Sequence, residues 1–348
     1  MSRFALLAAA ALASASILPS ARTADAETLN LTVLGQPVGS GLIAQEKEAP
    51  FFANLAAETG LDVAVEYRPV DVAGIPDSDG LRVLKSGLFD IVSIRGPQVS
   101  RDEPTVLGLD LIGMNELRRR PRRIPRPSSR PWRPASRSSS TRSSGPLAGR
   151  PAGHLLQARD REPRRSPGLK GRVRRQSAAA FVDGLGATGV PMPFGEVQQS
   201  LARGVVDCAI TGPASANSGG WPEATTTVLP IALQLAINGY AVNLDTWNGM
   251  APEDQAKLQS AIEALSADIW AYSEELYEDA MRCNAGAEPC THGKPYALKE
   301  APVSDADLAT VAAAVGEVSL PIWAEQCNAV NPGCEAAWRE AVGTKLGL

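Results

Sequence analysis

The amino-acid sequence predicts an α/β protein with more than one domain, and three observations support this prediction. The chain has 348 residues, more than one ordinary domain, and 44% of them are hydrophobic, which suffices for two cores. Between Phe181 and Pro213, helix and strand patterns alternate with almost no residues left for connections, as is typical of a parallel or mixed sheet. After Pro252, one amphipathic pattern continues for roughly eight helical turns.

The first residues have the pattern of a secretory signal peptide. Arg3 supplies a positive charge, Phe4 to Leu18 an apolar core, and Ala24-Asp25-Ala26 a small-residue cleavage site. The apolar stretch is too short to cross a membrane, and we expect no later stretch to reach that length. Residues 1–26 are therefore predicted to be removed, which leaves an exported chain without membrane insertion.

The cysteines fit an exported protein. Cys283 and Cys290 bracket a six-residue loop, and Cys327 and Cys334 bracket another of the same length. We predict disulfides Cys283–Cys290 and Cys327–Cys334, because neither pair has the tight spacing of a zinc site. The fifth cysteine, Cys208, lies in a predicted buried strand and is interpreted as inert packing.

Strand and helix signals alternate along the first hundred residues. Leu29 to Leu34 is the first predicted strand, and residues 35–41 form a glycine-rich turn that opens a helix ending at Gly60. Residues 63–67 and 89–94 are the next strands. The N–H groups of the glycine-rich turn could hold an anion, although a tight strand–helix turn without a ligand needs the same glycines.

The stretch from Phe181 to Pro213 has the clearest pattern. One helical run of apolar residues stops at Gly186, and a second stops at Gly204. Val205 to Ile210 then forms a nearly continuous apolar run, which is typical of a strand buried on both faces. Ligands of such sheets bind at the carboxyl ends of the strands.

A polar segment separates this stretch from the long helix. Residues 214–221 are expected to form a loop that carries one aromatic side chain. Residues 238–248 read as a further strand that leads to the helix. Pro252 opens that helix, and Glu253 and Asp254 in its first turn suit the helix dipole.

Several short motifs in the central stretch resemble one family. They are G-A at 186–187, V-P at 190–191, E-V at 196–197 and R-G-V-V-D at 203–207. In type and order they resemble the DctP-like extracytoplasmic solute receptors of tripartite ATP-independent periplasmic (TRAP) transporters. Gly189, Gln198 and Cys208 depart from the residues common in that family, which are Pro, Tyr and Gly. Spread over about 25 residues, the match is more specific than a single glycine motif.

The resemblance implies a two-lobe, type II periplasmic-binding-protein-like α/β fold. Strands cross a hinge between the lobes, and a long scaffold helix lies across both. Residues 27–114 and 241–348 would form lobe 1 with the scaffold and C-terminal helices, and residues 115–240 would form lobe 2.

The residues from Arg118 to Gln176 differ in composition from the rest of the chain. They hold 19 of the 34 basic residues but only two of the 38 acidic ones, a net charge of +17 in a chain whose total is −4. Arginine, proline and serine dominate, without the apolar period that a core needs. Such a segment is typical of a disordered basic arm that binds nucleic acid or anionic membranes.

We favour a second hypothesis for this segment, because an acidic exported receptor has no use for such an arm. Sequence that resembles the family stops near Met114 and resumes near Ser177, and the interval has about the length that the family uses for part of its second lobe. Residues 118–176 are therefore interpreted as out-of-frame translation of a GC-rich gene. The alternative of a genuine basic arm stays open.

A receptor for organic anions needs a guanidinium in its cleft, because Arg matches a carboxylate with two parallel hydrogen bonds and stays charged. The resemblance assigns that role to the arginine of a G-x-K-x-R-V run, which corresponds here to Arg172, with Arg174 as the second choice. It implies weaker contacts from eight other residues: Gln36, Ser40, Arg95, Thr211, Gly212, Asn217, Trp221 and Asn238.

The sequence contains no recognisable catalytic motif. Its two histidines, His154 and His292, have no evident nucleophile or acid partner, and no nucleotide-binding or metalloprotease motif occurs. We expect a binding protein without enzyme activity, metal or cofactor, which captures a small organic acid for TRAP membrane permease subunits. The alternatives are a receptor of an ATP-driven (ABC) importer, a frame-disrupted receptor without function, and a protein that binds nucleic acid or membranes through the basic arm.

Overall fold

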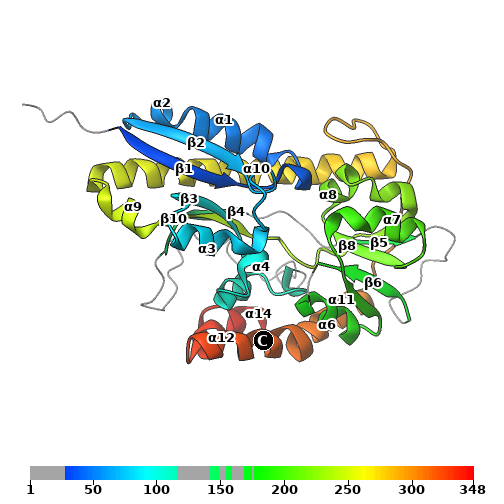
Figure 1. Ribbon diagram of the computed structural model, residues 1–348. Helices are drawn as coiled ribbons and strands as arrows, with labels where there is room; N and C mark the ends of the chain where they lie inside the picture. The colour runs from blue at the N-terminus through cyan, green and yellow to red at the C-terminus, as the bar shows by residue number, and fades with distance from the viewer. Residues whose placement is uncertain (1–27, 116–140, 149–153, 159–167, 175) are drawn as a thin grey trace, which may run out of the picture.

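The computed structural model describes residues 28–115, 141–148, 154–158, 168–174 and 176–348. The predicted signal peptide and much of the segment from 118 to 176 lie outside these residues. Figure 1 shows two lobes side by side, each built on its own sheet, with a long helix running along both. The predicted two-lobe α/β architecture with a scaffold helix is confirmed.

The first lobe is built on a five-stranded sheet in the order β2-β1-β3-β10-β4. Its strands are β1 (Leu29–Gly35), β2 (Val63–Pro69), β3 (Ile91–Arg95), β4 (Thr141–Ala148) and β10 (Asn238–Asn243). Strand β1 runs parallel to β2 and β3, whereas β10 runs antiparallel to β3 and β4. The first three strands follow the apolar pattern of the sequence.

Short helices follow the first three strands of this lobe along the chain. They are the 3₁₀-helices η1 (Val38–Ser40), η3 (Asp77–Asp79) and η4 (Pro104–Leu109), the π-helix η2 (Ala44–Glu48), and the α-helices α1 (Ala49–Ala53), α2 (Leu55–Thr59), α3 (Gly80–Lys85) and α4 (Gly96–Val99). The single helix expected before Gly60 is thus broken at Asn54. Gly60 ends it in the left-handed conformation, with φ 66°, as predicted.

The second lobe is built on a six-stranded sheet in the order β11-β9-β5-β8-β6-β7. Its strands are β5 (His154–Ala158), β6 (Lys170–Val173), β7 (Thr188–Pro191), β8 (Cys208–Thr211), β9 (Thr225–Leu229) and β11 (Lys299–Glu300). Strand β6 is parallel to both β7 and β8, so residues just after β6 and β8 lie at the same edge of the sheet.

The helices of this lobe correct two expectations. They are α6 (Gln176–Gly184), η5 (Phe194–Glu196), α7 (Val197–Ala202), α8 (Pro213–Ser218) and η6 (Trp221–Ala224). Much of the loop expected at 214–221 is helical, because Pro213 occupies the first helical turn and favours it. The strand expected to begin at Val205 is β8, which begins at Cys208 instead. Val205 lies in an exposed turn after Gly204.

Helix α10 (Pro252–Ala285) connects the two lobes physically. At 34 residues it is about 51 Å long. Leu258, Ile262 and Ile269 belong to the core of the first lobe, and the carboxyl-terminal half packs on α8 of the second. Short helix α9 (Leu244–Gly249) precedes it, capped by the Asn243 side chain.

The C-terminal helices pack under both lobes (Figure 1). They are α11 (Asp305–Ala314), η7 (Val315–Ser319), α12 (Leu320–Val330), α13 (Cys334–Trp338), η8 (Arg339–Gly343) and α14 (Thr344–Leu346). The continuous run Asp305–Val330 is long and apolar enough to cross a membrane by length and composition, with a mean hydropathy of 1.2, so the expectation that no later stretch reaches spanning length was wrong. Core helices of folded proteins pass the same test, and here Leu320 and Trp323 pack on Leu107 and Leu111.

Part of the arginine-rich segment is built into the sheets. Strand β4 pairs with β10 in the first sheet, and β5 pairs with β8 and β9 in the second. The domain division drawn from the sequence stays a prediction, and β4 differs from it because this strand lies in lobe 1. The out-of-frame hypothesis also stays a hypothesis.

Both predicted disulfides are present, Cys283–Cys290 and Cys327–Cys334. Cys208 is free and buried, and burial, followed by the charge of Asp207, raises the pKa of its thiol to about 12. At neutral pH it is therefore protonated and weakly nucleophilic, in keeping with a packing role.

Candidate functional site

A cleft between the lobes brings together six of the ten predicted binding residues. They are Arg95, Arg172, Arg174, Thr211, Gly212 and Asn238. Strand β3 supplies Arg95 from the first lobe, β6 and the end of β8 supply residues from the second, and α10 closes one side with Ser273, Leu276 and Tyr277. The cleft holds about 1030 Å³ of empty space, part of which is open to solvent.

Arg172 is the most unusual residue of the cleft, because it is only 2% exposed. Its Nε and Nη2 atoms both donate to the carbonyl oxygen of Met192, at 3.1 and 2.8 Å, and Nη1 donates to the carbonyl oxygen of Ile210 at 3.4 Å. These bonds use three of the five N–H groups and leave one on each terminal nitrogen. Among the described residues, no carboxylate forms an ion pair with it.

Aromatic side chains support this guanidinium. It lies 5.2 Å from the ring centre of the fully buried Trp221, which packs on Phe194 at 5.0 Å. Trp221 does not line the cleft itself, so its cation–π contact with Arg172 lies in the protein interior. Burial lowers the pKa of Arg172 to about 10, which still leaves it charged at neutral pH.

The other two arginines of the cleft share one carboxylate. Arg95 forms an ion pair with Asp77, and Arg174 contacts the same Asp77 oxygen at 3.4 Å. Burial lowers the pKa of Arg95, and the Asp77 charge opposes that shift. Asp77 was not identified from the sequence.

The glycine-rich turn after β1 holds the protein's own carboxylates. Asp71 accepts the N–H groups of Val38 and Gly39 at 3.0 and 2.9 Å, and Glu48 accepts the N–H group of Gln36 at 2.7 Å. The predicted site residue Gln36 is buried and does not line the cleft. Ser40, another predicted site residue, ends helix η1. The anion capacity of this turn is therefore used internally.

Glu48 is fully buried and bonds to two tyrosines. Tyr240 donates to one carboxylate oxygen at 2.6 Å and Tyr67 to the other at 2.9 Å. Burial, together with the Glu48 charge, raises the pKa of both phenols. This network holds helix η2 against β2 and β10.

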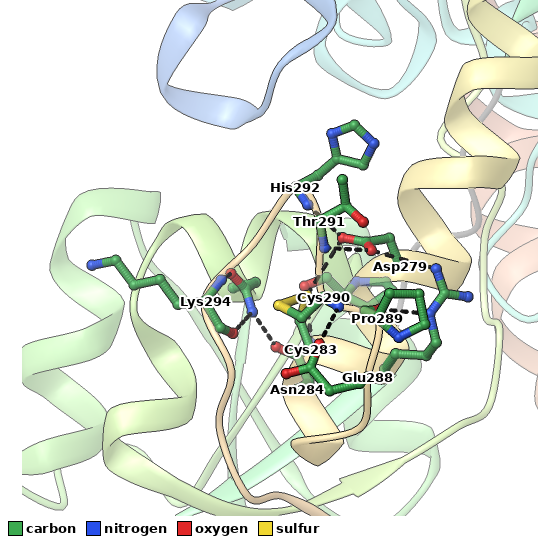
Figure 2. The surroundings of a disulfide bond; sticks show 12 residues. Asp279, Cys283, Asn284, Glu288, Pro289, Cys290, Thr291, His292 and Lys294 are labelled. Carbon is green, nitrogen blue, oxygen red and sulfur yellow. Dashed lines mark hydrogen bonds and ion pairs between the residues drawn. A yellow bond between two sulfur atoms is a disulfide. The ribbon is translucent and has the colours of Figure 1, made fainter.

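The predicted binding residue Asn217 holds a loop. Its side chain donates to Asn284 and to the carbonyl oxygen of Lys294, both at 2.8 Å, and accepts the N–H group of Lys294. Figure 2 shows the same loop closed by the disulfide Cys283–Cys290. Asn217 therefore fixes α8, whose first residues line the cleft, without lining it itself.

Asp279 anchors the other end of this loop. It accepts the N–H groups of Thr291 and His292 at 2.9 and 2.8 Å (Figure 2). Burial alone would raise the pKa of Asp279, but these bonds and the charges of His292 and Arg282 lower it. His292 contacts Glu275 at 3.1 Å, and no group of three possible metal ligands occurs within the described ranges.

Sequence reasoning missed several polar residues of the cleft, among them Gln98, Gln234, Ser273 and Tyr277. Ser273 and Ser266 interrupt the buried face of α10, and each donates to the carbonyl oxygen four residues earlier, at 2.6 and 2.8 Å. A polar residue on an otherwise apolar helix face is the signal that could have found Ser273. Gln234, in an irregular segment, gave no such signal.

Comparison with known proteins supports the same family. Residues 161–285 match the family model described as bacterial extracellular solute-binding protein, family 7. No curated protein matches the chain.

Solved structures share the fold over nearly their whole length. A TRAP periplasmic solute-binding protein from Chromohalobacter salexigens with bound D-glucuronate is 20% identical, with a TM-score of 0.69 over 89% of this chain and 98% of that one. One from Desulfovibrio salexigens with bound orotic acid is 12% identical, with a TM-score of 0.70 over 91% and 99%. DctP7 of Bordetella pertussis, an extracytoplasmic solute receptor binding pyroglutamic acid, is 12% identical, with a TM-score of 0.68 over 89% and 99%.

The family model describes receptors for extracellular solutes rather than enzymes. The match covers the part of the chain that contains β6 to β10 and all of α10, and the fold shared with the Chromohalobacter salexigens protein covers 89% of this chain. Residues 161–285 thus match the family of bacterial extracellular solute-binding proteins, family 7, and the chain shares its fold with solved TRAP periplasmic solute-binding proteins.

Proposed function

We propose that this chain is a periplasmic receptor that captures a small organic acid in the cleft between its lobes and delivers it to TRAP permease subunits. The observation that carries the proposal is Arg172, a buried guanidinium on the cleft wall whose hydrogen bonds within the described chain go only to carbonyl oxygens. Residues 1–26 would direct export, and the permease would supply the driving force.

The chemistry of Arg172 favours a carboxylate as its missing partner. A buried positive charge without a counter-charge is costly, and a ligand carboxylate would remove that cost. The two remaining N–H groups, one on each terminal nitrogen, suit the two oxygens of a carboxylate. Structural relatives with bound D-glucuronate, orotic acid and pyroglutamic acid support this ligand class.

Thr211 and Gly212 lie beside this guanidinium at the carboxyl end of β8, where ligands of such sheets bind. On the facing lobe, Asn238 begins the crossing strand β10. Closure of the lobes about β10 and β4 would enclose the acid and give the permease a ligand-bound shape to recognise.

The arginine-rich segment bears directly on this function, because it contains β5 and Arg172. We propose that residues 118–176 arise from a shifted reading frame, with translation of the underlying DNA in all frames as the test. If neither alternative frame yields family-like sequence, the hypothesis is wrong and the segment is genuine.

The ligand test uses the mature chain with a panel of acids: D-glucuronate, D-galacturonate, pyroglutamate, orotate and succinate. At least one acid should raise the melting temperature, because a ligand at 100 times its Kd stabilises the native state by about 2.7 kcal/mol. Arg172→Met should weaken that acid by about 100-fold or more, and Arg172→Lys by somewhat less, as measured by calorimetry.

Arg203→Met is the matched control, because Arg203 is an exposed arginine of the same lobe that does not line the cleft. It should bind like the original chain. The proposal fails if no acid stabilises a well-folded sample, or if Arg172→Met binds the acid as tightly as Arg203→Met does.

A further inference from the structure

Within the described chain, three arginines line the cleft, and they differ in whether a carboxylate of the protein lies beside them. Arg95 and Arg174 both contact Asp77, whereas Arg172 pairs with no carboxylate of the described chain. Asp77 does not line the cleft itself. Asp77 is therefore an anion of the protein itself, outside the cleft lining, that pairs with two of these three guanidinium groups.

The residues of this contact come from both lobes. Asp77 begins η3 and Arg95 ends β3 in the first lobe, whereas Arg174 directly follows β6 in the second. Arg95 is 4% exposed, so its pair with Asp77 is fixed, and Arg174 has half of its side chain exposed. Arg174 of the second lobe therefore contacts an anion of the first lobe that Arg95 already holds.

From this arrangement we propose that Asp77 determines specificity, by reserving the cleft for ligands with a single carboxylate. The inference rests on the proposed function, in which Arg172 receives that carboxylate. Asp77 occupies the two arginines that could receive a second acidic group, and its negative charge repels such a group. A dicarboxylate therefore gains no second ion pair.

The test compares ligands of matched shape that differ in one charge. Succinate and succinamate have the same length, but succinamate replaces one carboxylate with a neutral amide. Glucarate and D-gluconate form a second such pair among open-chain six-carbon sugar acids, because gluconate has a hydroxymethyl group in place of one carboxylate. The ratio of the two Kd values within a pair measures the preference for one carboxylate, whichever pair the protein binds better.

In the original chain the member with one carboxylate should bind more tightly. Asp77→Asn should shift the ratio toward the dicarboxylate by about tenfold or more, because Arg174 is released and the repulsion is removed. The double variant Asp77→Asn with Arg174→Gln should lose that gain. Asp77→Glu keeps the charge and should keep the original preference.

Asp62→Asn is the control for net charge, since Asp62 is an exposed acid remote from the cleft lining. Melting curves establish which variants fold, and Asp77→Glu keeps the partner of Arg95 should Asp77→Asn fail to fold. In that case the neutral variant Asp77→Ser, whose hydroxyl oxygen can still accept a hydrogen bond from Arg95, takes the place of Asp77→Asn.

Two outcomes overturn the inference, and they are distinguishable. If the original chain binds acids and the ratio does not change in Asp77→Asn, or in Asp77→Ser as the substitute, Asp77 does not set specificity while the proposed function stands. If the original chain binds no acid of either kind, the proposed function itself is wrong.

Discussion

The two lobes treat negative charge in opposite ways. In the described part of the first lobe, three sets of anion-binding groups already have a carboxylate of the protein: Asp71 at the N–H groups of Val38 and Gly39, Glu48 at Gln36, and Asp77 at Arg95. On the second lobe, Arg172 is equally buried, but its hydrogen bonds within the described chain go only to carbonyl oxygens.

The difference separates residues that support the fold from a residue reserved for a ligand. A buried charge with a partner is costly to disturb, whereas a buried charge without one is costly to keep. Arg172 therefore lowers the stability of the empty protein, which is the usual cost of a binding residue. A ligand carboxylate would supply the counter-charge that Arg172 lacks on the second lobe.

The largest expected effect compares the two buried arginines directly. Arg95→Met should lower the free energy of unfolding by about 3–5 kcal/mol, because Asp77 would lose its buried partner. Arg172→Met should leave the melting temperature of the empty protein unchanged or slightly higher. Urea and thermal unfolding measure the stability of both variants. Equal losses of stability would show that the two buried arginines do not differ in this way.

A second prediction concerns Glu48. Glu48→Gln should cost roughly 2–3 kcal/mol, because it weakens three hydrogen bonds to a charged acceptor that is fully buried. Glu58→Gln, an exposed change of the same kind, should cost almost nothing. A Glu48→Gln variant as stable as Glu58→Gln would show that the first lobe does not depend on this internal anion.

The same network predicts a pH dependence. The pKa values of Tyr67 and Tyr240 are raised above the ordinary value of 10.0, so these phenols stay protonated in the folded protein while they ionise in the unfolded chain. The contribution of these two phenols to the free energy of unfolding is fully present below pH 10 and is lost as the pH rises above it. Tyr240→Phe should reduce that fall in alkaline unfolding curves, and an unchanged slope would contradict the assignment.

The third prediction sharpens the comparison through the two disulfides, which have the same sequence separation of 7. Replacing either pair of cysteines with alanine should cost about 2 kcal/mol of stability. Only Cys283→Ala with Cys290→Ala should also weaken acid binding by several-fold, because that loop holds Asn217 and α8. Equal binding by the two double variants would separate this loop from the cleft.

The smallest effect is expected at Asp71. Asp71→Ala should lower stability by about 1 kcal/mol, because two exposed backbone N–H groups lose their acceptor and gain water instead. Acid binding should stay unchanged, as measured by calorimetry. A large loss of binding would mean that the glycine-rich turn belongs to the ligand site after all.

Much of the fold could be predicted from the sequence, because local pattern determines it. The alternation at 63–67 and the glycines at 60 and 204 identified element types and ends correctly. Helix α8 was missed because its serines and asparagines also favour loops. The break at Asn54 in the helix expected before Gly60 could not be predicted, because the spacing of the apolar residues does not change there.

The site could be predicted only in part, because its key contacts join distant segments. A family motif pointed to Arg172, yet nothing local distinguishes Asp77 among 38 acidic residues. Asp77 and Arg174 are 97 positions apart, and only the fold brings them together. The predicted contacts of Gln36 and Asn217 with a ligand stay predictions, while in the structure both side chains are buried away from the cleft lining.

Helix α10 has a consequence for how the molecule unfolds. Its amino-terminal half is part of the first lobe's core, and Asn284 near its end donates to the carbonyl oxygen of Pro213 in the second lobe. Neither lobe can lose its structure without exposing one half of a helix that the other lobe helps to hold. We expect the lobes to melt in one cooperative transition, so that an acid bound in the cleft raises a single melting temperature for the whole chain.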